Sequence, residues 1–512
     1  MPRALFSVYD KTGLVPFASS LVGLGWDLVA SGSTELSLRG AGLPVTPVEQ
    51  LTGLHEMLSG GVQTLHPAIY GGILARDSVD DMRVLRDFGY APINMVVCNL
   101  YPFQEMVSQL GVSLQDAIEQ IDIGVVSLLR ASAKNFFRVI VLSDVTDYTK
   151  VSAELKAAGE VELATRRKLA VKAFALTRDY DTAIHAFLSQ DMVQSLSTST
   201  LPQHLSIGMQ QVEILRYGEN PHQAAAYYSR IANSGPLGGI VLGGKQLSYN
   251  NILDLDAAWR SVSSFTDPTV VIVKHLNPTG VATSNTIANA YPKALASDPL
   301  SAFGGVIAVN QMVDDDFVQG LGTLFVEAIA APAFSPSAQT NLANNRKNCR
   351  LLQISQQFSG HEFDIRSVHN GLLVQSADMG DSEGTVLTTV TTRQPSDTEL
   401  KALQFAWKAV QHVRSNGIVL AIEDATIGIG GGLSSRVDAA QLAVAKAGER
   451  AKGAVLASDA FFPFADGLEV AIKAGVTAVI QPGGSIRDKE VIEAANKANI
   501  AMVFTGTRHF RH

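Results

Sequence analysis

The sequence predicts an α/β protein with parallel sheets, and three features support this prediction. Short apolar runs such as Ala4–Val8 and Trp26–Ala30 have the composition of buried strands. Between Asp10, a candidate helix cap, and Leu24 the apolar residues recur at steps of three and four, as on one face of a helix. Strands that alternate with helices favour a parallel sheet covered by helices on both faces. With 512 residues, the chain is long enough for two to four domains.

The composition excludes several classes of protein. Hydrophobic residues make up 46% and charged residues 17%, which is typical of a compact globular chain. The net charge is −8 and no dense Lys/Arg run occurs, so nucleic acid is not an expected partner. Two cysteines, Cys98 and Cys349, support neither a disulfide framework nor a Cys-rich zinc site. No apolar run resembles a signal peptide or approaches the roughly 20 residues of a membrane-spanning helix, so we expect a soluble cytoplasmic enzyme without a membrane partner.

A candidate phosphate loop follows the second predicted strand. Ser31, Gly32, Ser33 and Thr34 come directly after Trp26–Ala30 and precede a helix-like segment. Free backbone N–H groups, hydroxyl donors and the positive end of a helix together can hold a phosphate. An ordinary Ser/Thr helix cap explains these four residues at least as well, so both interpretations stay open.

The remainder of the first half continues the alternation and then ends in a polar stretch. The expected elements are a strand at Ile93–Asn99, a helix at Val125–Lys134, a strand at Arg138–Leu142 and a long helical region at Val161–Leu188. Ser189–His204, rich in Ser, Thr and Gln, is the best domain boundary in the chain. We therefore expect a first domain at 1–190, a linker at 191–205 and a second region at 206–512.

The most informative stretch of the second region is Val270–Gly280. Its apolar run, Val270–Val273, stops abruptly at Lys274 and His275, and Asn277 and Pro278 then favour a turn. The two ionisable residues are therefore expected at a sheet edge, where open α/β sheets place their chemistry. A lysine beside a histidine offers a cation and a base together. For an isolated pair, a surface lysine and a loop histidine would be the simpler interpretation.

The second region also shows signs of duplication. Ser458-Asp459, which precedes a Phe-rich loop, resembles Ser297-Asp298, which precedes Phe303. This predicts two related subdomains, at about 206–370 and 371–512. An apolar strand at Ile500–Phe504 runs into the terminal residues 508–512, so we expect the tail to dock rather than fray.

Many motifs along the chain resemble, in the same order, those of one known family. They are Ser-Val-Tyr-Asp-Lys-Thr-Gly (7–13), Ser-Gly-Ser-Thr (31–34), Thr-Leu-His-Pro (64–67), Asn-Leu-Tyr-Pro-Phe (99–103), Ile-Asp-Ile-Gly (121–124), Arg-Ala-Ser-Ala-Lys-Asn (130–135), Arg-Tyr-Gly-Glu-Asn-Pro-His-Gln (216–223), Leu-Ser-Tyr-Asn-Asn (247–251), Lys-His-Leu-Asn-Pro (274–278), Ser-Ala-Phe-Gly-Gly (301–305) and Ser-Asp-Ala-Phe-Phe-Pro-Phe (458–464). The family is the bifunctional purine-biosynthesis enzyme that combines phosphoribosylaminoimidazolecarboxamide (AICAR) formyltransferase with inosine monophosphate (IMP) cyclohydrolase.

This resemblance implies a methylglyoxal-synthase-like parallel-sheet domain, followed by a duplicated cytidine-deaminase-like α/β region. It also implies a homodimer with formyltransferase sites built across the subunit interface. The zinc signature of deaminases, His-x-Glu with Pro-Cys-x-x-Cys, is absent from the sequence, so the deaminase-like fold does not imply zinc here. We expect no catalytic metal, and the resemblance leaves room for a structural monovalent cation.

The chemistry implied by the resemblance has two steps. A formyl group passes from the co-substrate 10-formyltetrahydrofolate to the 5-amino group of AICAR, giving FAICAR, which then loses water as its ring closes to IMP. The amine is a poor nucleophile, so the first step needs a base and a cation for the developing oxyanion. By resemblance, His275 is the base and Lys274 the cation, and Lys134, Tyr101 and Asp122 serve ring closure.

The same resemblance assigns binding positions for the nucleotides AICAR, FAICAR and IMP and for folate. Those for the cyclohydrolase nucleotide are Asp10, Lys11, Ser31, Gly32, Ser33, Thr34, Thr64, Asn99 and Ile123. Those for the formyltransferase nucleotide are Arg216, Tyr217, His222, Asn250, Gly304, Glu327, Asn416 and Arg436. Those on the folate side are Phe461, Asp466, Ser485, Ile486 and Arg508, of which Arg508 can pair with a phosphate or a carboxylate.

One departure from the family pattern leaves the second activity open. The family reads Arg-x-Lys before Thr-Leu-His-Pro, whereas this chain has Gly61 and Gln63. Gln63 can donate hydrogen bonds but carries no charge. The alternatives are a formyltransferase with a weakened or vestigial cyclohydrolase domain, and a nucleotide-binding regulatory protein without turnover. The presence of both Lys274 and His275 argues against the regulatory protein, because binding alone does not need a base.

Overall fold

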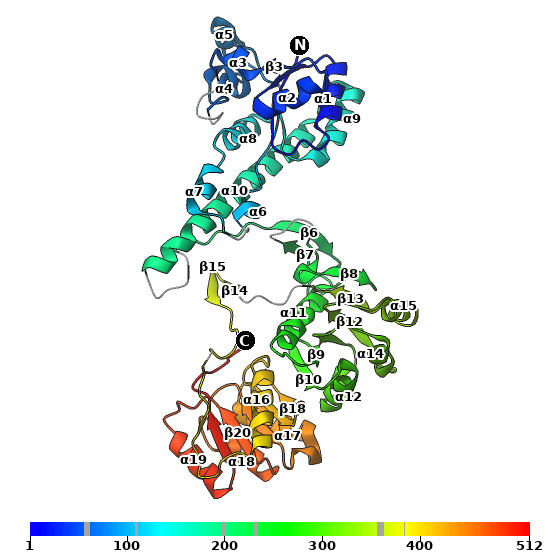
Figure 1. Cartoon of the computed structure of the whole chain (residues 1–512), viewed down its shortest axis with the longest axis vertical. Coiled ribbons are helices and arrows are strands. Elements are labelled where there is room, and N and C mark those ends of the chain that lie inside the picture. Colours follow the sequence, from blue (N-terminus) through cyan, green and yellow to red (C-terminus); the bar gives the residue numbers. More distant parts are fainter. Residues whose placement is uncertain are drawn as a thin grey trace. The chain divides into compact units, whose positions relative to one another are not determined.

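The computed structural model describes residues 1–55, 62–107, 111–196, 201, 203–229, 234–355, 363–382 and 384–512. The chain forms two compact units, Met1–Gly208 and Met209–His512, each of which is described by itself (Figure 1). Gly61, one of the two positions that depart from the family pattern, lies outside the described residues.

The first unit contains a five-stranded sheet in the order β3-β2-β1-β4-β5, and all of its strand pairs are parallel. The strands are β1 (Arg3–Val8), β2 (Asp27–Ala30), β3 (Thr46–Pro47), β4 (Met95–Asn99) and β5 (Ile140–Leu142). The helices are α1 (Leu14–Gly23), α2 (Gly32–Gly40), α3 (Val48–Thr52), α4 (Pro67–Leu74), α5 (Val79–Asp87), α6 (Phe103–Val107), α7 (Leu114–Glu119), α8 (Gly124–Lys134), α9 (Tyr148–Ala158) and α10 (Leu163–Leu196). Residues 95–98 of β4 are all buried, as expected for a strand covered on both faces. The predicted parallel sheet is thus confirmed for this unit.

Helix α10 is longer than the sequence analysis predicted. It continues to Leu196, so residues 191–196 of the expected linker are helical. Gln, Met and Leu in this stretch are good helix formers, and they outweigh the boundary signal of the neighbouring Ser and Thr residues.

The second unit is organised around a twelve-stranded sheet in the order β16-β21-β20-β19-β17-β18-β10-β9-β11-β12-β13-β8. Its strands are β8 (Ile240–Gly243), β9 (Thr269–Lys274), β10 (Asn277–Thr283), β11 (Gly305–Val309), β12 (Val326–Ala331), β13 (Arg350–Gln353), β16 (Thr388–Thr389), β17 (Ile418–Ile422), β18 (Ala425–Gly430), β19 (Val455–Ser458), β20 (Ala478–Gln481) and β21 (Ala501–Phe504). Two separate hairpins are formed by β6 (Gln210–Leu215) with β7 (Ala225–Ser229), and by β14 (Phe363–Val368) with β15 (Gly371–Ser376). The large sheet is mixed rather than parallel, because hairpins occupy its centre.

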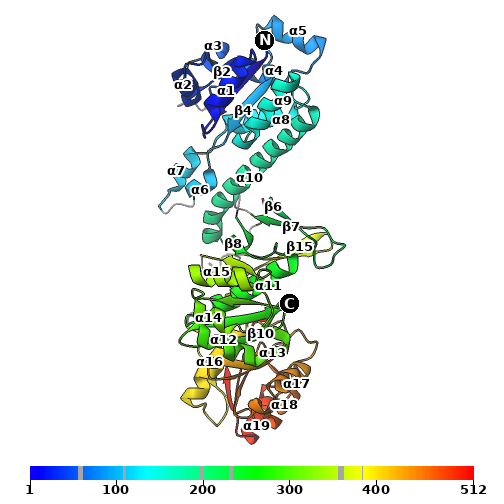
Figure 2. The same ribbon diagram turned by 90° about the vertical axis from the view of Figure 1, so that its right-hand side faces the viewer.

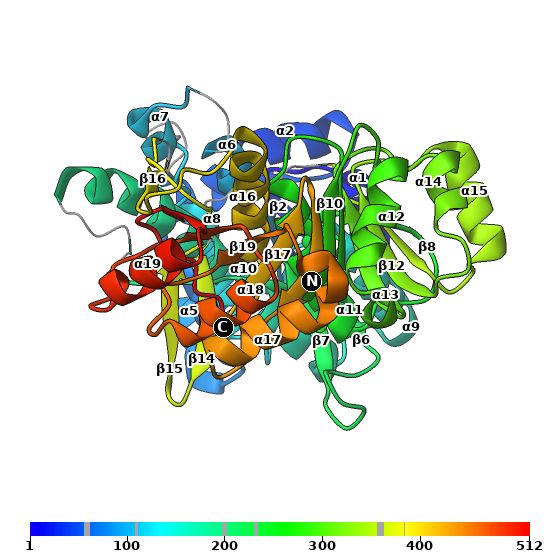
Figure 3. The same ribbon diagram turned by 90° about the horizontal axis from the view of Figure 1, so that it is seen from below.

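Helices cover both faces of this sheet. They are α11 (Tyr249–Ser263), α12 (Ile287–Ser297), α13 (Pro299–Ala302), α14 (Asp315–Gly320), α15 (Pro336–Asn345), α16 (Asp397–Val410), α17 (Arg436–Ala447), α18 (Asp466–Lys473) and α19 (Asp488–Lys497). Buried residues of α11 and α16 share one continuous core with strands of both halves of the sheet. On the other face, α12, α14 and α15 cover the first half and α17, α18 and α19 cover the second (Figures 2 and 3).

The twelve-stranded sheet contains an internal duplication, which confirms the predicted repeat. Strands β10-β9-β11-β12-β13 of the first half correspond in order and direction to β18-β17-β19-β20-β21 of the second. Antiparallel pairing of β10 with β18 joins the halves, with Ala282 opposite Ala425. The motif that suggested the repeat was nevertheless misleading: Ser297-Asp298 precedes β11, whereas Ser458 ends β19, the counterpart of β11. The boundary expected between residues 370 and 371 falls inside the β14–β15 hairpin.

Glycines let a helix approach the sheet closely in both halves. A methyl group on Gly280 of β10 would overlap the carbonyl oxygen of Ala294 on α12. Methyl groups on Gly428 and Gly430 of β18 would likewise overlap carbonyl oxygens of α17. Backbone approach this close leaves room only for a hydrogen atom at these positions.

The C-terminal tail is docked, as predicted, and His509 is its buried anchor, with a side chain only 1% exposed. Its Nδ1 lies 2.7 Å from Asp378 and its Nε2 lies 3.1 Å from Asp381. Burial by itself lowers the pKa of His509, but the two carboxylates outweigh this effect and the pKa is raised overall. The Trp407 indole donates to Asp381 at 2.6 Å and packs against the His509 ring.

We expect Gly280→Ala to lower the free energy of unfolding of the second unit by about 1–3 kcal/mol, because the added methyl group must push α12 away from the sheet. Urea denaturation of the purified chain measures this loss. Gly243→Ala on β8 is the matched control, since a methyl group there meets nothing within 4 Å. Equal stability of the two variants would show that α12 can move away from the sheet without lowering the free energy of unfolding.

We also expect the second unit to lose stability as the pH rises through the folded pKa of His509. The folded pKa is raised, so the stabilisation is complete below the unfolded value near ~6.5 and disappears at higher pH. Nearby groups stay constant there, because the pKa of Asp378 is lowered and that of His412 falls to about 3. Denaturation of His509→Gln between pH 6 and 9 should show a smaller pH dependence than the parent chain. His369→Gln, at an exposed residue, is the control, and identical slopes for all three proteins would contradict the assignment.

Candidate active sites

Lys274 and His275 lie in a tight turn at the end of two central strands. Lys274 ends β9 and pairs with Asn277, the first residue of β10, so His275 and Leu276 alone form the turn. Both have positive φ, at 53° and 65°. Hairpin turns of this kind favour Asn-Gly, and bulky residues adopt the conformation at an energetic cost that is typical of functional sites. The pair therefore lies at the end of the strands and not at a lateral edge of the sheet, because β9 and β10 are interior strands.

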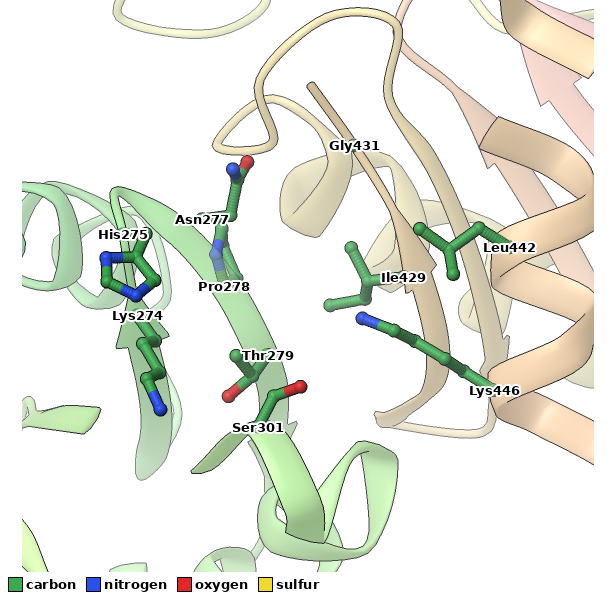
Figure 4. A pocket seen from close by; sticks show the side chains of 10 residues that line it. All are labelled: Lys274, His275, Asn277, Pro278, Thr279, Ser301, Ile429, Gly431, Leu442 and Lys446. Atoms are coloured by element: carbon green, nitrogen blue, oxygen red, sulfur yellow. The ribbon is translucent and has the colours of Figure 1, made fainter. Parts of the chain in front are cut away.

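A cavity of about 370 Å³ opens beside this turn (Figure 4). Figure 4 shows Lys274, His275 and Asn277 on one side and Leu442 and Lys446 on the other, so both halves of the duplicated sheet contribute. The volume is within the range of small-molecule sites. The complete lining is Lys274, His275, Asn277, Pro278, Thr279, Ser301, Ile429, Gly431, Leu442 and Lys446.

The cations at the cavity are held in fixed positions. The Lys274 ammonium donates to the carbonyl oxygen of Phe303 at 2.7 Å. The next residue, Gly304, has a φ of 72°, and a methyl group there would lie 4.0 Å from the Lys274 ammonium. Lys446 pairs with Asp298 at 2.9 Å. Burial raises the pKa of Asp298, but hydrogen bonding from Ser301 and the nearby Lys446 ammonium bring it below the usual value.

Sequence reasoning missed one residue that touches the turn. Asp254 on α11 accepts a hydrogen bond from the backbone N–H of Leu276 at 2.7 Å. Burial raises the pKa of Asp254, and backbone hydrogen bonds from Leu276 and His275 oppose that rise. No local pattern marks this aspartate, because it meets the turn only when α11 packs against β9. The other eight residues that line the cavity were not predicted as site residues either, and four of them, Ile429, Gly431, Leu442 and Lys446, come from the second half of the sheet.

Two predicted nucleotide contacts, Asn416 and Arg436, are brought together in a buried network. Arg436 begins α17, is 7% exposed, and donates to Asp459 at 2.5 Å and to Asn416 at 2.8 Å. The Asn416 amide also donates to Leu433 at 2.9 Å. Ser415 donates to the other carboxylate oxygen of Asp459 at 2.5 Å and accepts from the backbone of Arg511, so the docked tail completes this network.

The remaining positions predicted for the formyltransferase nucleotide lie away from the cavity lining. The Arg216 guanidinium lies 5.3 Å from the centre of the Tyr217 ring, and His222 is exposed in the same loop after β6. Asn250 donates to the carbonyl oxygen of Glu219 in this loop at 3.4 Å. Glu327 is paired with Arg350. Among the positions predicted from the sequence and described by the structure, Lys274 and His275 alone line the cavity.

The folate-side positions share one edge of the second half of the sheet. They lie beyond the carboxyl ends of the parallel strands β19, β20 and β21, where open sheets bind ligands. Ile486 is wholly exposed, and Arg508 stacks over Phe510 at 4.6 Å. The positions are Phe461 after β19, Asp466 at the start of α18, Ser485 and Ile486 after β20, and Arg508 after β21.

In the first unit, the loops after β1, β2 and β4 meet at the carboxyl edge of the sheet. The Asn99 amide oxygen accepts from the backbone N–H groups of Tyr9 at 2.7 Å and Asp10 at 3.0 Å, which links β4 to the loop after β1. Lys11 donates to the Ser33 hydroxyl at 3.2 Å, which links that loop to the start of α2. This arrangement of a lysine, hydroxyl groups and a helix N-terminus suits a phosphate.

The hydroxyl groups of this loop are not used as the helix cap that the sequence left open. Ser31 precedes Gly32 at the start of α2, but its side chain makes no capping hydrogen bond; its hydroxyl lies 3.4 Å from that of Ser7. Thr34 is buried, and its hydroxyl bonds both the N–H and the carbonyl of Val8. Thr34 therefore supports the loop, whereas the exposed Ser33 is available for a ligand.

Several cyclohydrolase positions lie around the start of α8. Asp122 accepts from the N–H of Val125 at 2.7 Å, and the Tyr180 hydroxyl accepts from the N–H of Asp122 at 2.8 Å. Burial raises the pKa of Asp122, against the opposing effect of N–H bonds from Val125 and Gly124, and such a shift suits a proton-transfer group. Thr64 lies beside Gly124, on which a methyl group would lie 3.2 Å from the Thr64 hydroxyl.

Tyr101 lies beside the carboxyl-edge loops, but Lys134 does not. The Tyr101 ring meets Tyr9 edge-on at 4.7 Å. Ile123 is exposed at the start of α8, while Lys134 is the exposed last residue of the same helix. At a rise of 1.5 Å per residue, this eleven-residue helix separates Lys134 from Asp122 by about 16 Å. At the second position that departs from the family pattern, the Gln63 side-chain amide donates a hydrogen bond to the Glu49 carboxylate at 2.9 Å.

Within the described ranges, no group of three or more His, Cys, Asp or Glu side chains could hold a metal ion. No helix in the part of the chain that the structure describes is both long and apolar enough to span a membrane.

Comparison with known proteins identifies the family. A sequence model described as "AICARFT/IMPCHase bienzyme" matches residues 132–446, and one described as "MGS-like domain" matches residues 13–127. The bifunctional purine biosynthesis protein PurH of Desulfitobacterium hafniense (strain DSM 10664 / DCB-2) is 47% identical over 100% of this chain and 99% of its own length. PurH of Listeria monocytogenes (serotype 4b, strain F2365) is also 47% identical, over 100% of both chains.

A solved structure was also matched. The crystal structure of ForH is 34% identical and covers 36% of this chain and 98% of its own, but its TM-score of 0.33 is too low to support an argument about the fold. The full-length identity to the PurH proteins, together with both sequence models, confirms the expected family. The chain belongs to the AICARFT/IMPCHase bienzyme family, with a methylglyoxal-synthase-like domain followed by the formyltransferase region.

Proposed function

We propose that the chain catalyses the last two steps of IMP synthesis, with Met209–His512 transferring the formyl group to AICAR and Met1–Gly208 closing FAICAR to IMP. The observation that carries this proposal is the Lys274-His275 turn at a 370 Å³ cavity, in a chain of the bienzyme family. The alternative of a formyltransferase with a vestigial cyclohydrolase domain has no support, since bifunctional relatives match along the whole chain.

In formyl transfer, His275 takes the proton that the AICAR amine loses as it attacks the formyl carbon. Lys274, held by the Phe303 carbonyl, stabilises the oxyanion that forms on the formyl oxygen. Collapse of this intermediate breaks the bond to the folate nitrogen, and tetrahydrofolate leaves after it gains a proton. The folate itself is the formyl donor, and the loops beyond β19, β20 and β21, with Arg508, are its proposed binding surface.

In ring closure, the nucleotide phosphate is held at the start of α2, near Lys11 and Ser33. The carboxamide nitrogen attacks the formyl carbon and the formyl oxygen leaves as water. The nitrogen must therefore lose protons and the oxygen must gain them. Asp122, whose pKa is raised, and Tyr101 are the proposed groups for these transfers. The role of Lys134 stays a prediction from the resemblance, because the fold of one chain holds it at the far end of α8. A structural monovalent cation also stays a prediction.

We further propose a cytoplasmic homodimer. Three exposed apolar side chains near the cavity and the folate loops support an interface with a second subunit. They are Leu300, Phe303 and Ile486, which are 88%, 58% and 103% exposed. The nucleotide positions that lie away from the cavity also fit a site completed by a second subunit.

Separation of the two activities tests the assignment of sites. His275→Ala should lower formyl transfer by about 10²–10⁴-fold, because the base is lost, while IMP formation from FAICAR stays unchanged. Asp122→Asn keeps an oxygen that can accept the N–H of Val125, so it should lower IMP formation from FAICAR and leave formyl transfer unchanged. Each reaction is assayed separately on the full-length protein. His369→Ala, at an exposed histidine in the turn between β14 and β15, is the control, and full formyl transfer by His275→Ala would remove the assigned base.

The dimer is tested by mass and by mixing. Light scattering should give a mass near twice 54.5 kDa. Coexpression of His275→Ala with Arg508→Ala should restore part of the formyl transfer that each variant lacks, if one site takes residues from both subunits. A monomeric mass, or no recovery in a verified mixed dimer, would contradict the shared site.

A further inference from the structure

The turn that carries His275 needs support from outside itself. His275 and Leu276 are consecutive residues with positive φ and large side chains, a conformation that such residues rarely adopt. A two-residue turn of this type forms readily with Asn-Gly, but here its two residues are His275 and Leu276. Contacts with neighbouring elements must therefore keep the imidazole in place.

Asp254 supplies such a contact from α11. Its Oδ1 accepts the N–H of Leu276 at 2.7 Å, and the backbone of His275 also acts on this carboxylate, whose pKa it lowers. Helix α11 is held against the sheet by core packing, since Leu255, the residue after Asp254, is fully buried. A Ser248-Asn251 capping box fixes the start of the same helix.

The opposite side of the turn is tied to the second half of the sheet. The Asn277 side-chain oxygen accepts the backbone N–H of Arg414 at 3.0 Å. The turn is thus held on one side by Asp254 of the first half and on the other by Arg414 of the second. Of these two ties, the Asp254 carboxylate alone brings a negative charge.

The charge of Asp254 acts on the groups assigned to catalysis. Its carboxylate interacts electrostatically with both His275 and Lys274. An imidazole that takes a proton from AICAR becomes positive, and a fixed anion nearby stabilises that charge without having to reorganise. Lys446, on the opposite side of the cavity from His275, is paired with Asp298 and not with Asp254 (Figure 4).

We propose that Asp254 is a positioning residue for formyl transfer, whose carboxylate fixes the His275-Leu276 turn and stabilises the imidazolium formed as His275 takes the proton from the AICAR amine. The inference rests on the proposed role of His275 as the base.

The test compares Asp254→Ala and Asp254→Asn with Asp256→Asn in the full-length protein. Asp256 lies on the same helix and pairs with Arg260, so it controls for a lost charge on α11. We expect Asp254→Ala to lower kcat for formyl transfer 10- to 100-fold, with KM for AICAR changed less than 3-fold. Asp254→Asn keeps an accepting oxygen but no charge, so its kcat should fall less.

The same preparations provide the folding controls. IMP formation from FAICAR and the melting temperature should match those of Asp256→Asn. Should Asp254→Ala fail to fold, Asp254→Asn still decides the proposal through a lower kcat at an unchanged KM for AICAR, which general damage to the fold would not produce. A kcat within 2-fold of Asp256→Asn for the variants that fold, or a KM for AICAR that rises as much as kcat falls, would overturn it. If His275→Ala were itself fully active, the proposed function would fail instead, so the two failures are distinguishable.

Discussion

The second unit depends on the antiparallel contact between β10 and β18. This contact is short, with Ala282 opposite Ala425, and the Thr426 hydroxyl reinforces it through the N–H and carbonyl of Val281. It turns two five-stranded repeats into one sheet, and so places the β9–β10 turn beside α17. The cavity exists because of this seam, since its lining comes from both repeats. Neither repeat alone would surround His275 with the side chains that the cavity contains.

The candidate sites of the two units lie on different kinds of backbone structure. In the first, the sheet is parallel throughout, and loops that follow β1, β2 and β4 converge because parallel strands end at the same edge. In the second, a hairpin occupies the centre of the sheet, and its turn carries the reactive residues. A parallel strand needs only an ordinary loop at its end, whereas the hairpin requires a backbone conformation that its own residues disfavour. That difference explains why supporting contacts such as Asp254 matter more in the second unit.

The buried network around Arg436 shows how the tail becomes part of the interior. Asp459 binds Arg436 with one oxygen and Ser415 with the other, and the backbone of Arg511 bonds Ser415. His509 anchors the same tail between Asp378 and Asp381. A buried charge without a partner is strongly destabilising, so each of these groups constrains the others. Residues that are distant in the chain are thereby held around Asn416, a predicted nucleotide contact.

The sequence by itself determined the fold class, the family, the strand ends that carry chemistry and the existence of a repeat. Apolar runs, turn residues and ordered motifs are local signals, and a strand such as β4 or the break after Val273 can be recognised from a few neighbouring residues. The tertiary structure alone decided that β9 lies inside a mixed sheet, that Asp254 bonds the His275-Leu276 turn, and that Lys446 lines the same cavity as His275. These facts depend on strand order and on helix packing, and both arise from contacts between residues far apart in the chain. No local pattern encodes such contacts.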